Sequence, residues 1–275
     1  MTQATLLEQI KSKKSFLCVG LDVDQDRIPS DLKNEPDAIF TFCKRIIEAT
    51  APYCVAYKPN IAFFEAYGLE GWKSLEKVMN FLNRHYPEIF TIADAKRADI
   101  GNTSNRYAKA YFEQLEFDSI TIAPYMGRDS VEPFLEYVGK HAILLALTSN
   151  EGALDFQLLQ SGGKSLFEQV IEKSRNWQNA DRLMYVVGAT KAQALQKIRT
   201  LIPDSFLLIP GIGAQGGSLE EVSINGMNDQ CGLLVNSSRG IIYASSKSDF
   251  DQVAASVAKD LQQRMAFYLR QKEII

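Results

Sequence analysis

The sequence has few of the residues that build metal sites, disulfide frameworks or histidine-based triads. Its 275 residues include only two histidines and four cysteines. The cysteines show no Cys-x-x-Cys pair and no clustering with histidine, so neither a zinc site nor a disulfide framework is indicated and we expect buried thiols. Neither histidine stands in a Ser/His/Asp or His/Cys arrangement. Any chemistry must therefore depend mainly on lysine, aspartate and arginine.

The chain also lacks a strong net charge and a long apolar run. Its formal net charge of -3 gives no field that would attract nucleic acid or an anionic membrane. No apolar segment is long enough to cross a bilayer, and the amphipathic residues 1–14 lack the apolar core and cleavage site of a signal peptide. We therefore expect a cytoplasmic protein without a nucleic-acid or membrane partner.

What the sequence does contain is a regular alternation of short apolar runs and amphipathic stretches. Eight runs are typical of buried strands, at residues 16–21, 54–58, 90–95, 119–123, 142–147, 183–187, 206–209 and 232–236. The helical patterns cover residues 38–49, 71–84, 103–115, 130–138, 166–177, 191–199, 218–224 and 250–269. This alternation predicts an α/β protein with a parallel sheet, and eight units favour a single (β/α)8 TIM barrel over residues 1–275 with a short N-terminal helix. An open doubly wound sheet is the alternative, because a hydrophobic pattern does not show closure.

Charged side chains follow the third predicted strand at the point where it ends. The run Phe90-Thr91-Ile92-Ala93 leads into Asp94, Lys96 and Asp99. Alternate strand residues share a face, so Asp94 and Lys96 point the same way, while Asp99 lies in the turn before a helix. Taken alone, the segment also fits a solvated loop with a helix cap at Asn102 or Thr103.

Polar residues end other predicted strands as well, where a TIM barrel carries its chemistry. Lys58 follows the second strand, and a lone lysine there would usually extend to solvent. Here, however, carboxylates are expected at the same end of the barrel. A lysine and a carboxylate that lie close together each favour the ionised form of the other. Asp22, after the first strand, is either a turn residue or an acceptor for a sugar hydroxyl. Ser149 and Asn150, after the fifth, cap a helix or bind a heterocycle.

A glycine-rich loop follows the seventh predicted strand. A phosphate site is typically built from such backbone N–H groups, a helix N-terminus and an arginine. Here the next helix starts at Ser218, and Arg239 follows the eighth strand. The glycines 211, 213 and 216 also match the G-x-G-x-x-G dinucleotide pattern. That pattern usually opens the first βαβ unit and has an acid about 20 residues on, where this chain has Asn236. A purely structural turn is the remaining interpretation.

These motifs closely resemble those of the orotidine 5'-phosphate decarboxylase family, from Leu21 to Arg239. The resemblance is carried by Asp-x-Lys-x-x-Asp-Ile-Gly-x-Thr at residues 94–103, Lys58 upstream, and Gly-x-Gly-Ala-Gln-Gly-Gly and Ser-Arg-Gly downstream. Two segments are most similar to the longer bacterial subgroup of this family. They are Lys-Arg-Ala-Asp-Ile-Gly-Asn-Thr at residues 96–103 and Thr-Ser-Asn-x-Gly-Ala at residues 148–153.

The resemblance implies decarboxylation of orotidine 5'-phosphate to UMP, the last step of de novo pyrimidine biosynthesis, by a homodimeric barrel that needs no metal or cofactor. Lys96 is expected to stabilise the carbanion and donate the proton. The resemblance implies that the other site residues, some shared across the dimer, have these roles: catalysis for Lys58, Asp94 and Asp99, and substrate binding for Asp22, Ile100, Thr103, Ser149, Ile212, Gln215 and Arg239.

Two other functions share part of this pattern. Sugar-phosphate enzymes with a Mg-stabilised enediolate have a similar Asp-x-Lys-x-x-Asp motif, but a metal-binding acid is expected where this chain has Lys58, and a cation there repels Mg²⁺. A catalytically silent barrel that binds a phosphoribosyl ligand is the second. Ligand binding alone does not require the crowded charges of Lys96 and Asp99.

Overall fold

The computed structural model describes residues 1–33, 35–212 and 216–275. Eight strands form a closed barrel in the order β1-β10-β9-β8-β5-β4-β3-β2. Their bounds are Leu17–Leu21 (β1), Ala56–Pro59 (β2), Phe90–Arg97 (β3), Ser119–Ile122 (β4), His141–Leu147 (β5), Leu183–Val187 (β8), Leu207–Pro210 (β9) and Leu233–Ser237 (β10). Every predicted strand is present, and the closed order confirms the barrel and excludes the open sheet.

Helices occupy the stretches between the strands, as the amphipathic patterns predicted. They are α1 (Gln3–Lys13), α2 (Ala38–Thr50), α4 (Gly68–His85), α5 (Gly101–Lys109), α6 (Glu132–Leu135), α8 (Leu166–Ser174), α9 (Ala192–Leu201), α10 (Leu219–Gly226) and α12 (Phe250–Gln271). The helix predicted over residues 103–115 begins earlier, at Gly101, and changes to a π-helical turn over Ala110–Gln114. No helix in the described ranges is both long and apolar enough to span a bilayer.

Among the short helices and strands of the described residues, five were not predicted. They are α3 (Ile61–Glu65), α7 (Ala153–Phe156), the antiparallel pair β6 (Gln160–Ser161) and β7 (Lys164–Ser165), and α11 (Arg239–Ile242). Each is five residues or fewer. A segment of this length covers about one helical turn, so it shows no periodicity that a sequence pattern could reveal.

Most strand residues are apolar because the strands are buried on both faces over most of their length. All five residues of β1 and all five of β8 are buried. Parallel strands covered by helices on one side and by the barrel interior on the other have no solvent-facing row. The four cysteines are buried free thiols, as expected.

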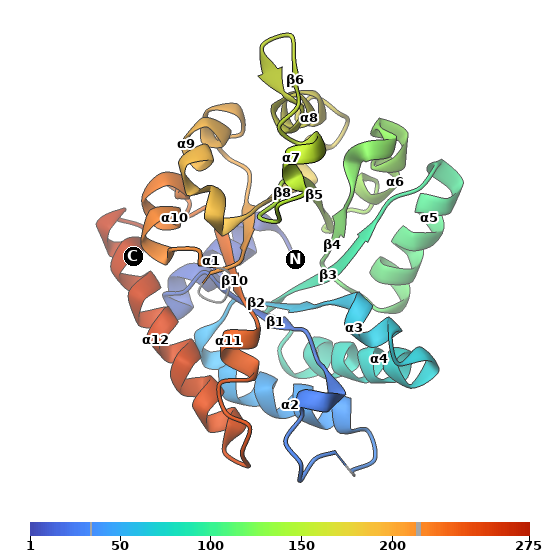
Figure 1. The fold of residues 1–275 in the computed structure, drawn as a ribbon, viewed down its shortest axis with the longest axis vertical. Helices are drawn as coiled ribbons and strands as arrows, with labels where there is room; N and C mark the ends of the chain where they lie inside the picture. Colours follow the sequence, from blue (N-terminus) through green and yellow to red (C-terminus); the bar gives the residue numbers. More distant parts are fainter. Residues whose placement is uncertain (34, 213–215) are drawn as a thin grey trace. The chain divides into compact units, whose positions relative to one another are not determined.

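The described chain divides into two compact units. The first contains Met1–Ala95, Leu115–Phe117 and Asn236–Ile275, and the second contains Lys96–Gln114 and Asp118–Val235. In the first unit α12 lies along α2 (Figure 1). In the second, the β6–β7 hairpin extends beyond α8 (Figure 1). The assignment of residues 1–275 to one domain stays a prediction.

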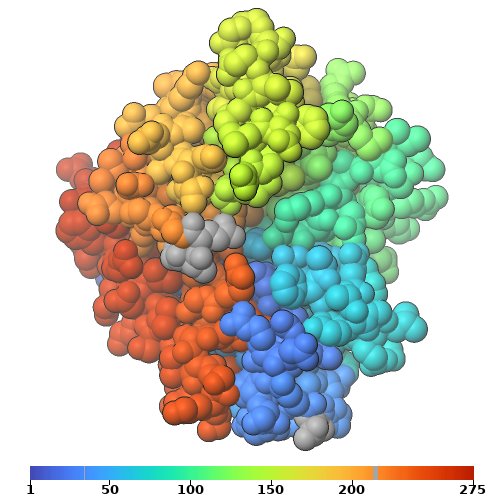
Figure 2. All heavy atoms as spheres, viewed as in Figure 1, coloured from blue at the N-terminus to red at the C-terminus, as the bar shows by residue number. Residues whose placement is uncertain are grey.

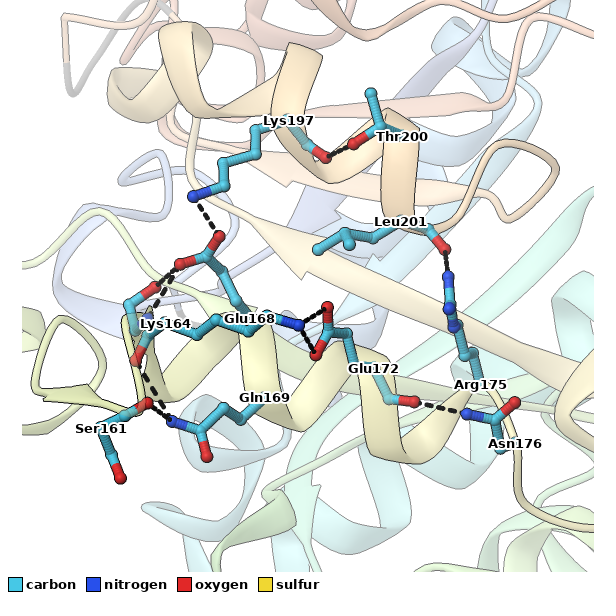
Figure 3. Close-up of polar contacts among 11 residues, drawn as sticks. Ser161, Lys164, Glu168, Gln169, Glu172, Arg175, Asn176, Lys197, Thr200 and Leu201 are labelled. Atoms are coloured by element: carbon cyan, nitrogen blue, oxygen red, sulfur yellow. Dashed lines mark hydrogen bonds and ion pairs between the residues drawn. The ribbon is translucent and has the colours of Figure 1, made fainter.

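The second unit contains a polar junction between α8 and α9. Lys197 of α9 points toward Glu168 of α8 and forms an ion pair with it (Figure 3). Glu168 also accepts hydrogen bonds from the backbone N and the Oγ of Ser165, at 2.9 and 2.5 Å, which completes a capping box at the start of α8. Burial raises the pKa of Glu168, but the bonds from Lys197 and Ser165 outweigh it and lower the pKa from 4.5 to about 2.

We expect Glu168→Gln to destabilise the fold in a pH-dependent way. Because the folded pKa lies below the unfolded value, the stabilisation by this carboxylate is present above about pH 4.5 and is lost as the pH falls toward 2. The variant should lose roughly 2 kcal/mol of unfolding free energy at pH 7 and show a flatter pH profile in acid. Urea denaturation at several pH values measures both effects.

Glu172→Gln is a matched control on the same helix. Glu172 pairs with Lys164, whose side chain is half exposed, and it has no part in the capping box (Figure 3). We expect the control to change the unfolding free energy by less than about 0.5 kcal/mol. Equal losses in the two variants would contradict the role of the Glu168 junction.

Candidate active site

A buried ion pair joins the second and third strands in the first unit. In the β1–β2 register, Lys58 lies opposite Gly20, and a parallel bridge pairs Asn60 with Asp94. Residues two apart on a strand share a face, as do paired residues of neighbouring strands. Lys58 therefore points to the same side of the sheet as Asn60 and its partner Asp94. Lys58 Nζ lies 2.6 Å from Asp94 Oδ2, and the two side chains are 4% and 12% exposed. The structure therefore brings together two of the four predicted catalytic residues.

The surroundings of Lys58 keep it positively charged. Burial alone lowers the pKa of its ammonium group. The negative charges of Asp94 and Asp22 and the hydrogen bond to Asp94 act in the opposite direction, and the resulting pKa lies above its ordinary value. Lys58 is therefore a hydrogen-bond donor and a fixed cation, not a base.

Asp22 is held just beyond β1 by a tyrosine that the sequence analysis missed. Tyr243 Oη donates to the backbone oxygen of Asp22 at 3.2 Å and accepts from the backbone N of Asp24 at 2.6 Å. The guanidinium of Arg27 lies 4.0 Å from the centre of the Tyr243 ring. In Figure 2 the blue segment after β1 lies against the orange segment around α11. Tyr243 lies more than 200 residues from Asp22 in sequence, so no local pattern indicated it.

The end of β10 lies against β1 at Gly20. A Cβ on Gly20 would lie 2.7 Å from Ser238 Cβ and 3.1 Å from Asn236 Oδ1, so only glycine leaves room for these two side chains. Ser238 Oγ donates to Gly20 O at 3.2 Å. Arg239 follows as the exposed first residue of α11. Of these residues, only Arg239 was predicted to belong to the site.

In the second unit, Lys96 has an unusual backbone conformation. Its φ of 48° is left-handed, and Lys96 is the one residue inside a strand among the seven non-glycine residues with positive φ in the described ranges. Its backbone N donates to Thr121 Oγ1 at 2.9 Å. A lysine in this region costs about 1–3 kcal/mol, and such strain persists where the surrounding structure imposes it, often at functional sites. The conformation therefore singles out Lys96 independently of its sequence motif.

Asp99 begins a tight turn into α5. Its backbone N donates to Ser104 Oγ at 2.9 Å, and Ser104 Oγ donates in turn to Asp99 O at 2.7 Å. Asp99 Oδ1 accepts from the backbone N of Ile100 at 2.7 Å. Thr103 is half-buried in the first turn of α5, whereas Ile100 is 61% exposed. The turn fixes the Asp99 backbone and leaves an apolar side chain in solvent beside it.

Ser149 follows β5 and lies against Gly188 at the end of β8. A Cβ on Gly188 would lie 2.6 Å from Ser149 N and 2.7 Å from Ser149 Cβ. Gly188 N donates to Leu147 O at 2.8 Å, which fixes this close approach. Gly188 was missed, since the sequence gives no sign of which strand end it faces.

The structure describes the two ends of the glycine-rich loop, residues 211–212 and 216–217. Gly211 and Gly216 have positive φ of 102° and 82°, and Gly217 N donates to Gly211 O at 3.1 Å. Ser218 caps α10 by accepting from Glu221 N at 3.3 Å, as predicted. Ile212 is 7% exposed. Gln215, predicted to bind phosphate, lies outside the described residues.

The first unit thus holds an acceptor carboxylate, a buried ion pair and an arginine, and the second holds a strained lysine, a second carboxylate and a serine. Among the residues that the structure describes, no group of three or more His, Cys, Asp or Glu side chains has a metal-site arrangement. Fixed positive and negative charges of this kind can orient an anionic substrate and stabilise charge that develops during a reaction.

Comparisons with known proteins agree on one family. Residues 15–249 match the family model described as "Orotidine 5'-phosphate decarboxylase / HUMPS family". The chain is 63% identical over 266 residues to an orotidine 5'-phosphate decarboxylase of Christiangramia forsetii, covering 97% of this chain and 98% of the relative. It is 62% identical to that of Flavobacterium johnsoniae, covering 97% of each. The solved OMP decarboxylase of Leishmania donovani matches with a TM-score of 0.81 at 37% identity, covering 97% of this chain and all of that one.

Proposed function

The chain belongs to the orotidine 5'-phosphate decarboxylase family, and from this membership we propose that it converts orotidine 5'-phosphate to UMP without a metal or cofactor. The observation that supports this mechanism best is the buried Lys58–Asp94 ion pair at 2.6 Å. Asp94 begins the same short segment that carries Lys96 and Asp99. A charge pair of this kind is costly to bury and is explained by a reaction that uses it.

The reaction requires stabilisation of a localised negative charge. When the bond between C6 of the pyrimidine and the carboxylate breaks, CO2 leaves and the electron pair stays on C6 in the plane of the ring. The π system cannot delocalise this pair. A fixed cation can stabilise it electrostatically. In our proposal the Lys96 ammonium stabilises the pair and then donates its proton to C6, which completes UMP.

The neighbouring charges prepare Lys96 for this step. Asp94 lies beside the departing carboxylate of the substrate, and Lys58 holds Asp94 in place. Asp99, which in our proposal comes from the other subunit of a dimer, adds a negative charge that attracts and positions the Lys96 ammonium group. The left-handed backbone at Lys96 and its bond to Thr121 support a precise orientation of the side chain.

The remaining residues recognise the substrate in this proposal. Asp22 accepts hydrogen bonds from ribose hydroxyls, and Ser149 binds the edge of the pyrimidine. Thr103 also contacts the nucleotide. Ile100 and Ile212 provide apolar surface near the base. Gln215 and Arg239 bind the phosphate, for which a guanidinium supplies several donors in a fixed fork.

We expect Arg239→Ala to lower kcat/KM for orotidine 5'-phosphate by about 10²- to 10³-fold, because the lost bonds to the phosphate are charge-assisted. Binding energy from the non-reacting phosphate contributes to ordering the charged groups. Steady-state kinetics with the wild type and the variant measures the loss.

The phosphate-free nucleoside orotidine provides an internal control. Wild type and Arg239→Ala should turn over orotidine at similar rates, since the contact is absent in both. Arg270→Ala, at an exposed arginine in α12, should leave both substrates unaffected. An unchanged kcat/KM of Arg239→Ala for orotidine 5'-phosphate would exclude the proposed phosphate contact.

We also propose a homodimer in which Asp99 and Thr103 reach the active site of the partner subunit. The proposal is supported by large apolar side chains that the second unit exposes: Ile100, next to Asp99, is 61% exposed, and Tyr125 and Met126, after β4, are 87% and 50% exposed. Apolar groups gathered on a surface often mark an interface. Sedimentation analysis that found only monomers at assay concentrations would contradict this arrangement.

The function is tested by the change in ultraviolet absorbance when the purified protein is mixed with orotidine 5'-phosphate in EDTA. We expect rapid conversion to UMP, as the last step of de novo pyrimidine synthesis in the cytoplasm requires. Activity that EDTA removes would favour a Mg-dependent sugar-phosphate enzyme instead. Binding of UMP without any turnover would favour a silent phosphoribosyl-binding barrel.

A further inference from the structure

Asn236, near the end of β10, has a buried acceptor atom to which no described residue donates. The residue is 6% exposed, and its Oδ1 has no hydrogen-bond partner among the described residues. Leaving a buried acceptor unsatisfied costs about 1–3 kcal/mol in a typical protein. Such atoms are uncommon in native folds, and each one calls for an explanation.

The position of this atom is defined within the first unit. Asn236 Oδ1 lies next to Gly20, where it would be 3.1 Å from a Cβ if one were present. Gly20 lies opposite Lys58 in the β1–β2 register. Asn236 and Lys58 thus flank the same glycine, on the two strands that adjoin β1.

Asp22 provides a second acceptor on this face. It follows Gly20 by two residues, so its side chain is on the same side of the strand. Its Oδ1 is also buried without a hydrogen-bond partner among the described residues. Lys58 adds a charged donor. The face therefore offers two unused acceptors and one ammonium group.

A ligand group that fits this face must donate hydrogen bonds to the two acceptors. It must also be uncharged, because a cation would be repelled by the Lys58 ammonium group. Hydroxyl groups do so, because each donates one hydrogen bond and can accept another from Lys58. A sugar with two adjacent hydroxyls matches two acceptors. An asparagine suits this place better than a carboxylate, since a further negative charge beside Asp22 and Asp94 would be repelled.

We infer that Asn236 is a substrate-binding residue whose Oδ1 accepts a hydrogen bond from a ribose hydroxyl of the substrate, next to the one that Asp22 binds. The inference rests on the proposed function, and it adds a residue that neither the motifs nor the family comparison assigned. It also accounts for the buried acceptor, because the substrate hydroxyl supplies the hydrogen bond that the described residues do not. Gly20 belongs to the same binding site, because a side chain at this position would displace Asn236.

The variant Asn236→Leu separates this role from a structural one. Leucine has nearly the same shape and removes the unused acceptor. Replacing an unsatisfied polar group by an apolar one of the same shape is neutral or stabilising, so the melting temperature should stay the same or rise. At the same time kcat/KM for orotidine 5'-phosphate should fall by roughly 10- to 100-fold. A residue with a purely structural hydrogen bond would show the reverse.

Substrate analogues identify the hydroxyl. Wild type and Asn236→Leu are compared on orotidine 5'-phosphate and on its 2'-deoxy and 3'-deoxy analogues. On the analogue that lacks the hydroxyl bound by Asn236, the two proteins should have kcat/KM values within about threefold of each other. On the other two substrates the variant should keep its full penalty.

Two results would overturn the inference. One is the same penalty on all three substrates, and the other is a lowered melting temperature with unchanged kinetics. Wild-type turnover of orotidine 5'-phosphate is measured first. Its absence contradicts the proposed function, whereas wild-type turnover with either of these two results contradicts only the role of Asn236.

Discussion

Replacement of Lys96 by alanine is expected to reduce kcat for orotidine 5'-phosphate by at least about 10⁴-fold while leaving the protein folded. The estimate combines two losses. A missing proton donor typically costs about 10²- to 10⁴-fold, and a missing charge at the developing anion costs about 10²- to 10³-fold. Since Lys96 has both roles in the proposed mechanism, no other group replaces it.

The fold should tolerate this change. The Lys96 side chain is exposed, and its backbone N donates to Thr121 Oγ1, a bond that alanine can also make. Alanine keeps a Cβ at the same left-handed φ, so the backbone strain is similar in the two proteins. The melting temperature should therefore change little, and a loss of activity cannot be assigned to unfolding.

The assay is single-turnover decarboxylation followed by ultraviolet absorbance, with thermal melting in parallel. Lys109→Ala is the matched control, because Lys109 is an exposed lysine of α5 in the same unit. The control should have wild-type kinetics. If Lys96→Ala kept more than about a hundredth of wild-type kcat, the assignment of Lys96 as proton donor would be rejected.

The second large effect is expected at the buried ion pair. Replacing Lys58 by methionine should leave the Asp94 carboxylate without its ammonium partner at 2.6 Å. Breaking a buried pair from one side typically costs 3–5 kcal/mol, because the remaining charge stays out of water. For a chain of this size, that corresponds to a fall in melting temperature of roughly 10 °C. Activity should also be lost, since both residues belong to the catalytic group in our proposal.

A double variant distinguishes the structural part of this loss from the catalytic part. In Lys58→Met with Asp94→Leu, no charge of the pair remains buried, and apolar side chains fill a similar volume. Such replacements are often neutral or stabilising, so the melting temperature should recover to near that of the wild type. Decarboxylation should stay undetectable. Recovered activity in the double variant would show that the pair is structural and would contradict its place in the mechanism.

Much of the fold followed from local sequence patterns. The barrel strands were predicted because most of their residues are buried on both sides and thus form apolar runs, and the polar residues that follow several of these runs indicated where the site should lie. The same reasoning identified Lys58, Asp94 and Lys96 as candidates. Ser218 was recognised as a helix start because capping depends on a side chain and the N–H groups two or three residues later.

The tertiary structure decided which of these strand ends meet. Gly20 accommodates Asn236, Gly188 accommodates Ser149, and Tyr243 holds the backbone of Asp22. The partners in two of these pairs lie more than 200 positions apart along the chain. Their contact depends on strand order, register and closure, which apolar periodicity does not encode.

The sequence by itself therefore determined the strand and helix pattern, the family and the charged residues of the proposed reaction, because each depends on side chains close together in the chain. Only the tertiary structure decided that Lys58 and Asp94 form a buried pair, that Lys96 has a left-handed backbone, and that no described residue donates to the buried Asn236 Oδ1. The physical reason is that burial and hydrogen-bond satisfaction belong to atoms that folding brings together from distant strands.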